Sequence, residues 1–252
     1  METLPKSYMR VTREITGYWG TYLPSLELEP GIIGRVVDGV LVKEGLLSQY
    51  PGYDPAIHAV REEAQREPVS LWNTRHVTLK VFGGDASLPG GAGSGSIRMQ
   101  FGGANEATII CNGNAYRAFA DLRAVKAFME QLLQDGKWDR EQCIVTEVLV
   151  SQKAWICFST GKDQTAELQL ASPLVPGADP LGVLKAAAGH ANLTASWANS
   201  QAAGYSTTLP NGGTPLFRAL QFRRDWFNPL HSRPQYLKGG ESPMEEPAFG
   251  GE

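Results

Sequence analysis

Residues 143–170 constrain the fold more than any other part of the sequence. The first half of this segment is an apolar run dense in β-branched side chains, and from residue 164 apolar and polar side chains alternate. Leu168 and Leu170 fall on the apolar side of the alternation, and Gln169 falls on the polar side. A period of two is typical of a half-buried strand. The segment therefore predicts the middle of an antiparallel sheet.

The composition is that of a folded chain with many turns. The 252 residues are 42% hydrophobic and 19% charged, and they include 28 glycines and 16 prolines. The net charge of −3 argues against a nucleic-acid partner, because phosphate contacts need an excess of lysine and arginine. The sequence holds no apolar run of about 18 to 20 residues. We therefore expect no transmembrane helix, and any entry into a membrane would use strands.

The cysteines and histidines indicate neither a metal site nor a cofactor. Cys111, Cys143 and Cys157 lack CxxC spacing, which argues against a zinc site and against a disulfide framework. The four histidines lie far apart, and none belongs to an HExxH motif. Folding can still bring a cysteine and a histidine together, so a Cys/His hydrolase stays open as a distant alternative. A soluble binding module without enzymatic activity is the nearer alternative.

The first predicted element is a basic amphipathic helix over residues 4–19. Lys6, Arg10 and Arg13 fall on one face, and the opposite face is apolar. Such a helix can lie on an anionic lipid surface, where each basic side chain contributes about 1 kcal/mol. Packing of its apolar face on the rest of the domain is the alternative, and the two are compatible.

Further elements follow from turn and periodicity signals. Asp38-Gly39 between two apolar runs predicts a tight hairpin over residues 32–47. We expect helices at residues 55–67, 115–135 and 179–188, and strands at residues 74–82, 97–101, 107–111, 193–197 and 216–222. The glycine-rich residues 83–96 lack the spacing of a phosphate-binding loop. Together these elements predict an α+β fold, a twisted antiparallel sheet backed by helices.

After these elements, the sequence resembles the gasdermin pore-forming domain over nearly its whole length. The strings that carry the resemblance are Val-Thr-Glu-Val-Leu at residues 145–149, with Gln-Lys at 152–153, and Pro-Asn-Gly-Gly-Thr-Pro-Leu-Phe-Arg-Ala at residues 210–219. Neither string is a catalytic signature, so the resemblance implies a protein that is not an enzyme. It implies a gasdermin-like fold that is able to refold into a transmembrane β-barrel.

The resemblance implies binding to acidic membrane phospholipids, assembly into a ring-shaped homo-oligomer, and insertion of hairpins from residues 74–111 and 158–222. Lys6, Arg10 and Arg13 would bind lipid. The implied membrane-inserting residues are Val77, Leu79, Val81, Ile97, Met99, Phe101, Leu168 and Leu170. The implied pore-lining residues are Lys80, Arg98, Gln169 and Arg218. Barrel strands need about 9 to 11 residues with one apolar and one polar face.

The resemblance also suggests where and how the protein would act. It implies a compact form with a pore-forming domain at residues 1–233. Regular patterns end after residue 233, and residues 239–252 carry four glutamates and no basic residue, so we expect a flexible acidic tail at residues 234–252. This form is similar to fungal gasdermins of allorecognition, in which a differing gasdermin chain is the trigger. It is also similar to bacterial types, in which release of a tail is the trigger. The protein would be cytoplasmic when inactive and would move to the cell membrane to cause programmed cell death.

Overall fold

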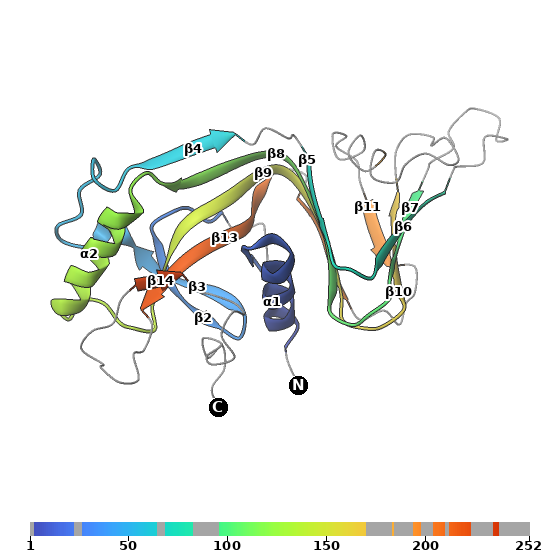
Figure 1. The fold of residues 1–252 in the computed structure, drawn as a ribbon, viewed down its shortest axis with the longest axis horizontal. Coiled ribbons are helices and arrows are strands. Elements are labelled where there is room, and N and C mark those ends of the chain that lie inside the picture. Colours follow the sequence, from blue (N-terminus) through green and yellow to red (C-terminus); the bar gives the residue numbers. More distant parts are fainter. Residues whose placement is uncertain are drawn as a thin grey trace. The chain divides into compact units, whose positions relative to one another are not determined.

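Figure 1 shows the fold in a computed structural model of the chain. The structure describes residues 3–22, 27–64, 69–82, 96–169, 183, 194–197, 204–209, 212–222 and 234–236. Within these ranges, neither helix combines the length and the hydropathy that a membrane-spanning helix needs.

The described residues form an α+β fold with mostly antiparallel strands. The first elements are α1 (Leu4–Thr16), β1 (Trp19–Gly20), β2 (Ile32–Val37), β3 (Val40–Leu46), the short 3-10 helix η1 (Leu47–Gln49), β4 (Val60–Ala64), β5 (Val69–Asn73), β6 (Val77–Phe82), β7 (Ser96–Phe101) and β8 (Glu106–Phe119). They are followed by α2 (Leu122–Gln134), β9 (Cys143–Ser159), β10 (Gln164–Gln169), β11 (Thr194–Trp197), β12 (Gly204–Leu209), β13 (Gly213–Phe222) and β14 (Pro234–Tyr236). The predicted fold class is confirmed at this level.

The chain divides into two compact units. The first unit holds Met1–Gln65, Ala115–Val150 and Thr214–Glu252, and the second holds Arg66–Asn114 and Ser151–Gly213. Strands β8 and β9 pass from one unit to the other. The predicted boundary between residues 233 and 234 stays a prediction, although β14, at the start of the predicted tail, pairs with β13.

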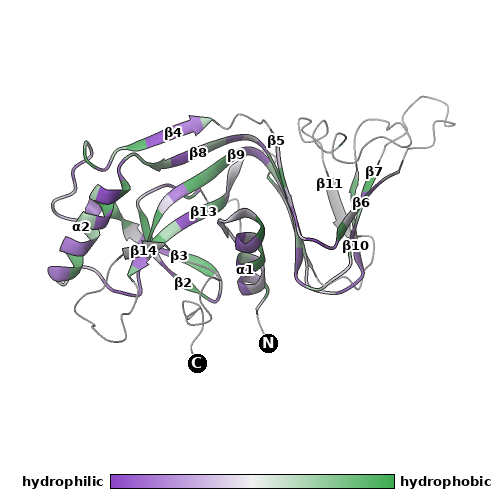
Figure 2. Cartoon of the chain, viewed as in Figure 1, coloured by the Kyte–Doolittle hydropathy of each residue, from purple (hydrophilic) through white to green (hydrophobic). Residues whose placement is uncertain are grey.

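In the first unit, two helices cover opposite faces of one sheet. The strand order is β1-β13-β9-β2-β3. Met9 of α1 shares a core cluster with Ile32, whereas Met129 of α2 shares another with Ile33. Neighbouring residues of a strand point to opposite faces, so each helix buries one face of the sheet. Figure 2 shows hydrophilic and hydrophobic residues side by side on α2, as such a helix requires.

The predicted hairpin forms, and its turn lies against the start of α1. Asp38 and Gly39 have positive φ values of 50° and 80°, which suit a tight two-residue turn. A Cβ atom on Gly39 would lie 2.4 Å from the backbone nitrogen of Lys6. The hydroxyl of Thr3 donates a hydrogen bond to the carbonyl of Asp38 at 3.4 Å. The turn and the first turn of the helix are therefore in direct contact.

Two predicted helices are wrong in whole or in part. The described part of the helix predicted at residues 55–67, residues 55–64, is not helical, because β4 pairs antiparallel with residues 115–119 of β8 and its backbone is committed to that ladder. The helix predicted at residues 115–135 begins only after Asp121, whose side chain accepts hydrogen bonds from two backbone amides of the first turn. The end at Gly136, with φ 68°, is confirmed.

The other predictions are confirmed to different extents. The first helix ends at Thr16, with Gly17 at φ 74° as its left-handed cap. Strands were expected where β6, β7, β11 and β13 lie, but β1, β5 and β12 were not predicted. The helix predicted at residues 179–188 lies outside the described residues apart from Val183, which is helical. Of the predicted tail, residues 237–252 also lie outside them.

Candidate functional site

The second unit contains a four-stranded antiparallel sheet with strand order β11-β10-β7-β6. We call it the four-stranded sheet. Its strands come from the two regions, residues 74–111 and 158–222, that the resemblance implies as membrane-inserting. The two regions meet directly, because β7 pairs with β10 from Phe101 opposite Gln164 to Ser96 opposite Gln169.

One face of the four-stranded sheet is apolar and buried. Along β7, Ile97, Met99 and Phe101 are fully buried while Arg98 and Gln100 are exposed. Leu168 and Ala166 of β10 are buried on the same face, and Val77 and Leu79 of β6 pack against them. The alternation predicted from the sequence is thus confirmed where side chains are described. The side chain of Val81 and residue Leu170 lie outside the described part of the chain.

The buried face of the four-stranded sheet packs on a second layer within the same unit. Ile110 of β8 and Trp155 and Cys157 of β9 belong to the same core cluster as Met99 and Leu168. All of these side chains are at most 2% exposed. If another apolar surface replaced this second layer, the apolar side chains of the four-stranded sheet would still be kept out of water.

The opposite face of the four-stranded sheet is polar and charged. Lys80, Arg98 and Glu167 lie side by side in one row across β6, β7 and β10. The Nη2 atom of Arg98 lies 3.6 Å from Oε2 of Glu167, in an ion pair whose arginine is exposed and whose glutamate is partly exposed. Such pairs contribute little to stability, about 0 to 1 kcal/mol. The side chain of Gln169 lies outside the description.

Arg218 does not join the other implied pore-lining residues. It lies on β13 in the first unit, where its Nη1 atom is 3.3 Å from Oε2 of Glu147. Its guanidinium stacks over the ring of Tyr18 at 4.1 Å from the centroid. Its role here is to pair with Glu147, inside the string that carries the resemblance.

The three basic residues of α1 have different surroundings. Lys6 is partly exposed next to the hairpin turn, and Arg10 forms an ion pair with Glu14 at 3.0 Å. Arg13 is half-buried over the ring of Trp19, at 4.2 Å from the centroid. Burial, and to a lesser extent the charge of Arg218, lower the pKa of Arg13 to about 10. Arg13 is therefore partly a packing residue.

The apolar side of α1 is buried, with Tyr8 and Val11 at most 2% exposed. The alternative in which this side packs on the domain is thus confirmed. Binding of its basic face to lipid is compatible with this packing and stays a prediction.

The cysteines do not resemble activated thiols. All three are buried, and burial raises the pKa of Cys111 and of Cys143 to about 12 and that of Cys157 further. His58 is packed between the rings of Tyr53 and Phe128. No group of three or more potential metal ligands occurs within the described ranges. Within the described residues, which do not include His190 and His231, these surroundings give the Cys/His hydrolase alternative no support.

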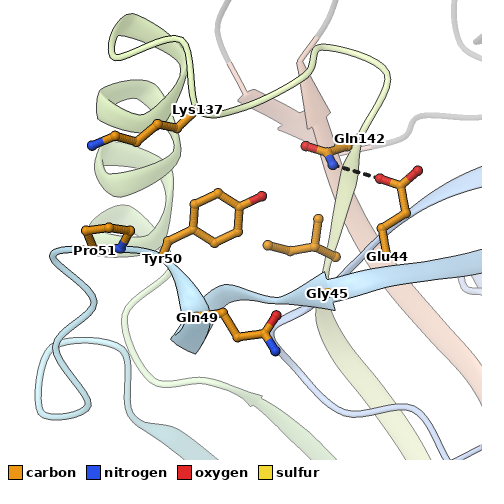
Figure 3. Close-up of a pocket in the computed structure, with 8 residues that line it drawn as sticks. Glu44, Gly45, Gln49, Tyr50, Pro51, Lys137 and Gln142 are labelled. Carbon is orange, nitrogen blue, oxygen red and sulfur yellow. Dashed lines mark hydrogen bonds between the residues drawn. The ribbon is translucent and has the colours of Figure 1, made fainter.

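A shallow cavity of about 460 Å³ lies in the first unit between β3 and the loop after α2. Figure 3 shows the ring of Tyr50 pointing into the space between Lys137 and Gln142. Glu44 accepts hydrogen bonds from Arg35 and from Gln142, each at 2.7 Å. Lys137 lies 3.4 Å from Asp135. Because both charged lining residues already have partners in the chain, the cavity does not define a ligand.

Sequence reasoning missed the two connections that lead into the four-stranded sheet. Residues 102–105 join β7 to β8, and residues 160–163 join β9 to β10. The signal was a pair of similar strings, Gly-Ala-Asn-Glu at residues 103–106 and Gly-Lys-Asp-Gln at residues 161–164. It also missed the Tyr18 contact with Glu147, for which no local signal exists.

No protein-family model matches the sequence, and no curated protein is similar enough to match it.

Proposed function

We propose that the protein is a pore-forming cell-death effector of the gasdermin type. In this proposal it binds acidic membrane lipids, forms a ring-shaped homo-oligomer and inserts β-hairpins that permeabilise the membrane. The observation that carries the proposal is the four-stranded sheet. It unites the two regions that the resemblance implies as inserting, and it has one fully apolar and one charged face.

The faces of the sheet suit the two sides of a barrel wall. The apolar residues that now pack on Ile110, Trp155 and Cys157 would face lipid, and Lys80 and Arg98 would face water. Among the described residues, the outer strands β6 and β11 each have one edge without a neighbouring strand in this sheet. Unpaired backbone groups are too unfavourable in lipid, so insertion requires that neighbouring copies pair these edges into a closed ring.

The basic residues of α1 provide the first lipid contact in this proposal. Lys6 and Arg10 are partly exposed on one side of the helix, while its other side is anchored in the core. Attraction to an anionic leaflet would bring the protein to the membrane before any strand inserts. Either a differing partner chain or release of the tail would then trigger insertion.

Dye release from liposomes tests the proposal. The full chain and a version that ends at Arg233 are each added to liposomes with acidic lipid, and to neutral liposomes as a control. We expect release only from the acidic liposomes, and a difference between the versions would identify the tail as a restraint. Absence of both release and binding would contradict the proposal. Binding by both versions without release would exclude release of the tail as a sufficient trigger, and would favour the soluble binding module or a trigger by a differing partner chain.

A charge-reversal pair tests the role of α1. Lys6→Glu with Arg10→Glu should abolish binding to acidic liposomes. Arg123→Glu with Lys126→Glu on α2 makes the same change in net charge and serves as the control, which should bind as the unmodified chain does. Equal binding by both pairs would remove α1 from the proposal. Arg13 is left in place, because its reversal would also disturb the packing on Trp19.

A further inference from the structure

Two corners of equal length and similar sequence turn the chain from the second layer into the four-stranded sheet. We name residues 102–105 the first corner and residues 160–163 the second corner. Each ends in a residue with left-handed backbone, Asn105 with φ 58° and Asp163 with φ 57°. They and Asp38 are the only non-glycine residues with positive φ in the described ranges. The corners lie side by side, because Phe101 pairs with Gln164.

In each corner, the residue that follows the left-handed one accepts a hydrogen bond with its side chain from a residue earlier in the chain. In the first corner, Glu106 Oε2 accepts a hydrogen bond from the amide of Gly103 at 3.0 Å, and Glu106 is only 4% exposed. In the second, Gln164 Oε1 accepts a hydrogen bond from the hydroxyl of Ser159 at 2.6 Å. The same hydroxyl contacts the carbonyl of Gly161 at 2.7 Å. Each closure depends on a few polar contacts rather than on a continuous ladder.

The corners also reverse which face of the chain points inward. In an uninterrupted strand, residues separated by an odd number lie on opposite faces. Phe101 and Ile110 are nine positions apart, yet both belong to the core between the two layers. Ala166 and Trp155, eleven positions apart, do the same. If the left-handed residue in each corner became extended, the apolar faces of the two layers would no longer point toward each other.

Insertion in the proposed function needs longer strands than the sheet now has. Strands β6, β7 and β10 have 6 residues each, whereas a membrane strand needs about 9 to 11. The long strands β8 and β9, with 14 and 17 residues, lead directly into the two corners. If the chain were extended through both corners, the strands of the four-stranded sheet would become longer. The polar residues of the corners would then follow directly on the apolar section of these strands.

On the basis of the proposed function, we propose that the two corners form a paired hinge. Closed, it holds the four-stranded sheet against Ile110, Trp155 and Cys157. When the hinge is open, β7 and β8 form one straight strand, and β9 and β10 form another. Opening uncovers Cys157, which lies beneath the sheet, whereas Cys111 lies on the other face of β8 from Ile110 and keeps its cover.

Backbone substitutions in the corners test the hinge in solution. Asn105→Val with Asp163→Val disfavours the left-handed backbone, and Asn105→Gly with Asp163→Gly preserves it. We expect the valine pair to raise the rate of thiol labelling at Cys157 about tenfold. The glycine pair should not raise it, and Cys143 in the first unit should be unchanged. Equal rates for both pairs, or parallel increases at Cys157 and Cys143, would overturn the proposal.

Labelling on membranes separates the hinge from the pore. The full chain is mixed with acidic liposomes, and dye release and modification of each cysteine are measured together by fluorescence and mass spectrometry. We expect Cys157 to become reactive as dye is released, with Cys111 protected. Dye release with Cys157 still protected would overturn the hinge and leave the pore standing. Labelling of Cys157 in the valine pair, without dye release from any version, would overturn the pore and leave the hinge standing.

Discussion

The hydroxyl of Tyr18 donates a hydrogen bond to Oε1 of Glu147 at 2.5 Å, joining the segment between α1 and β1 to the first half of β9. Burial raises the pKa of Tyr18, and the bond to Glu147 raises it further, so the hydroxyl stays protonated and donates. The second oxygen of Glu147 pairs with Arg218 at 3.3 Å. One carboxylate thus connects three segments far apart in the sequence.

Removal of the charge of Glu147 should destabilise the first unit. Glu147→Gln keeps an acceptor for Tyr18 but removes the carboxylate charge that pairs with Arg218, whose own charge acts on Arg13. We expect a loss of about 1 to 3 kcal/mol in the free energy of unfolding, measured by urea denaturation. Glu141→Gln, at an ion pair whose carboxylate is 74% exposed, should change it by less than about 0.5 kcal/mol. Equal effects would contradict this role.

The turn glycine at position 39 should be more sensitive than a glycine with the same backbone in open space. Gly39→Ala places a Cβ atom 2.4 Å from Lys6 at φ 80°, so the helix start must move. Gly136→Ala has φ 68° and no atom within 4 Å. The second change should cost about 1 kcal/mol, from the backbone alone, and the first clearly more. Chemical denaturation of both variants checks this, and equal losses would refute the contact.

The sequence allowed prediction of structure where one local pattern dominates. The alternation around Met99 and Leu168 is confirmed, because one face of each strand is buried and the other faces solvent. Asp38-Gly39 specified its own turn. The row of Lys80 and Arg98 followed from the same period of two, since the register of β6 and β7 keeps equivalent faces together.

Long-range pairing explains what the sequence did not reveal. Residues 60–64 have a polar composition that suits a helix, and only their partner strand 55 positions later makes them β4. Residues 115–119 were predicted to begin a helix, and only their pairing with β4 makes them a strand. Asp121 carried the correct capping signal for the start of α2. The Glu147 contacts with Tyr18 and Arg218 span 129 and 71 positions, and no local rule predicts them.

Stability should fall as pH rises through the alkaline range. Burial raises the pKa of Cys111 and of Cys143 from 9.0 to about 12 in the folded chain. The unfolded chain therefore loses these thiol protons first, so their stabilisation is complete below pH 9 and is lost toward pH 12. Each thiol contributes a slope of about −1.4 kcal/mol per pH unit in that window. Urea denaturation at several pH values should show a shallower slope for Cys143→Ala, and an unchanged slope would contradict the shift.

The charged row of the four-stranded sheet should set the ion preference of the proposed pore. Lys80 and Arg98 lie next to each other on the polar face, with Glu167 beside Arg98, so the row carries a net positive charge. Lys80→Gln with Arg98→Gln should shift the reversal potential of bilayer currents away from anion preference, because the pore lining then loses two positive charges.

Unfolding in urea gives the control for these two exposed residues, since their replacement should change stability by less than about 0.5 kcal/mol. Arg218→Gln is the matched variant. Because Arg218 pairs with Glu147 in the first unit, it should weaken folding and leave ion preference unchanged. A shift in ion preference with Arg218→Gln, but none with the Lys80 and Arg98 pair, would place the pore lining on β13 and away from the four-stranded sheet.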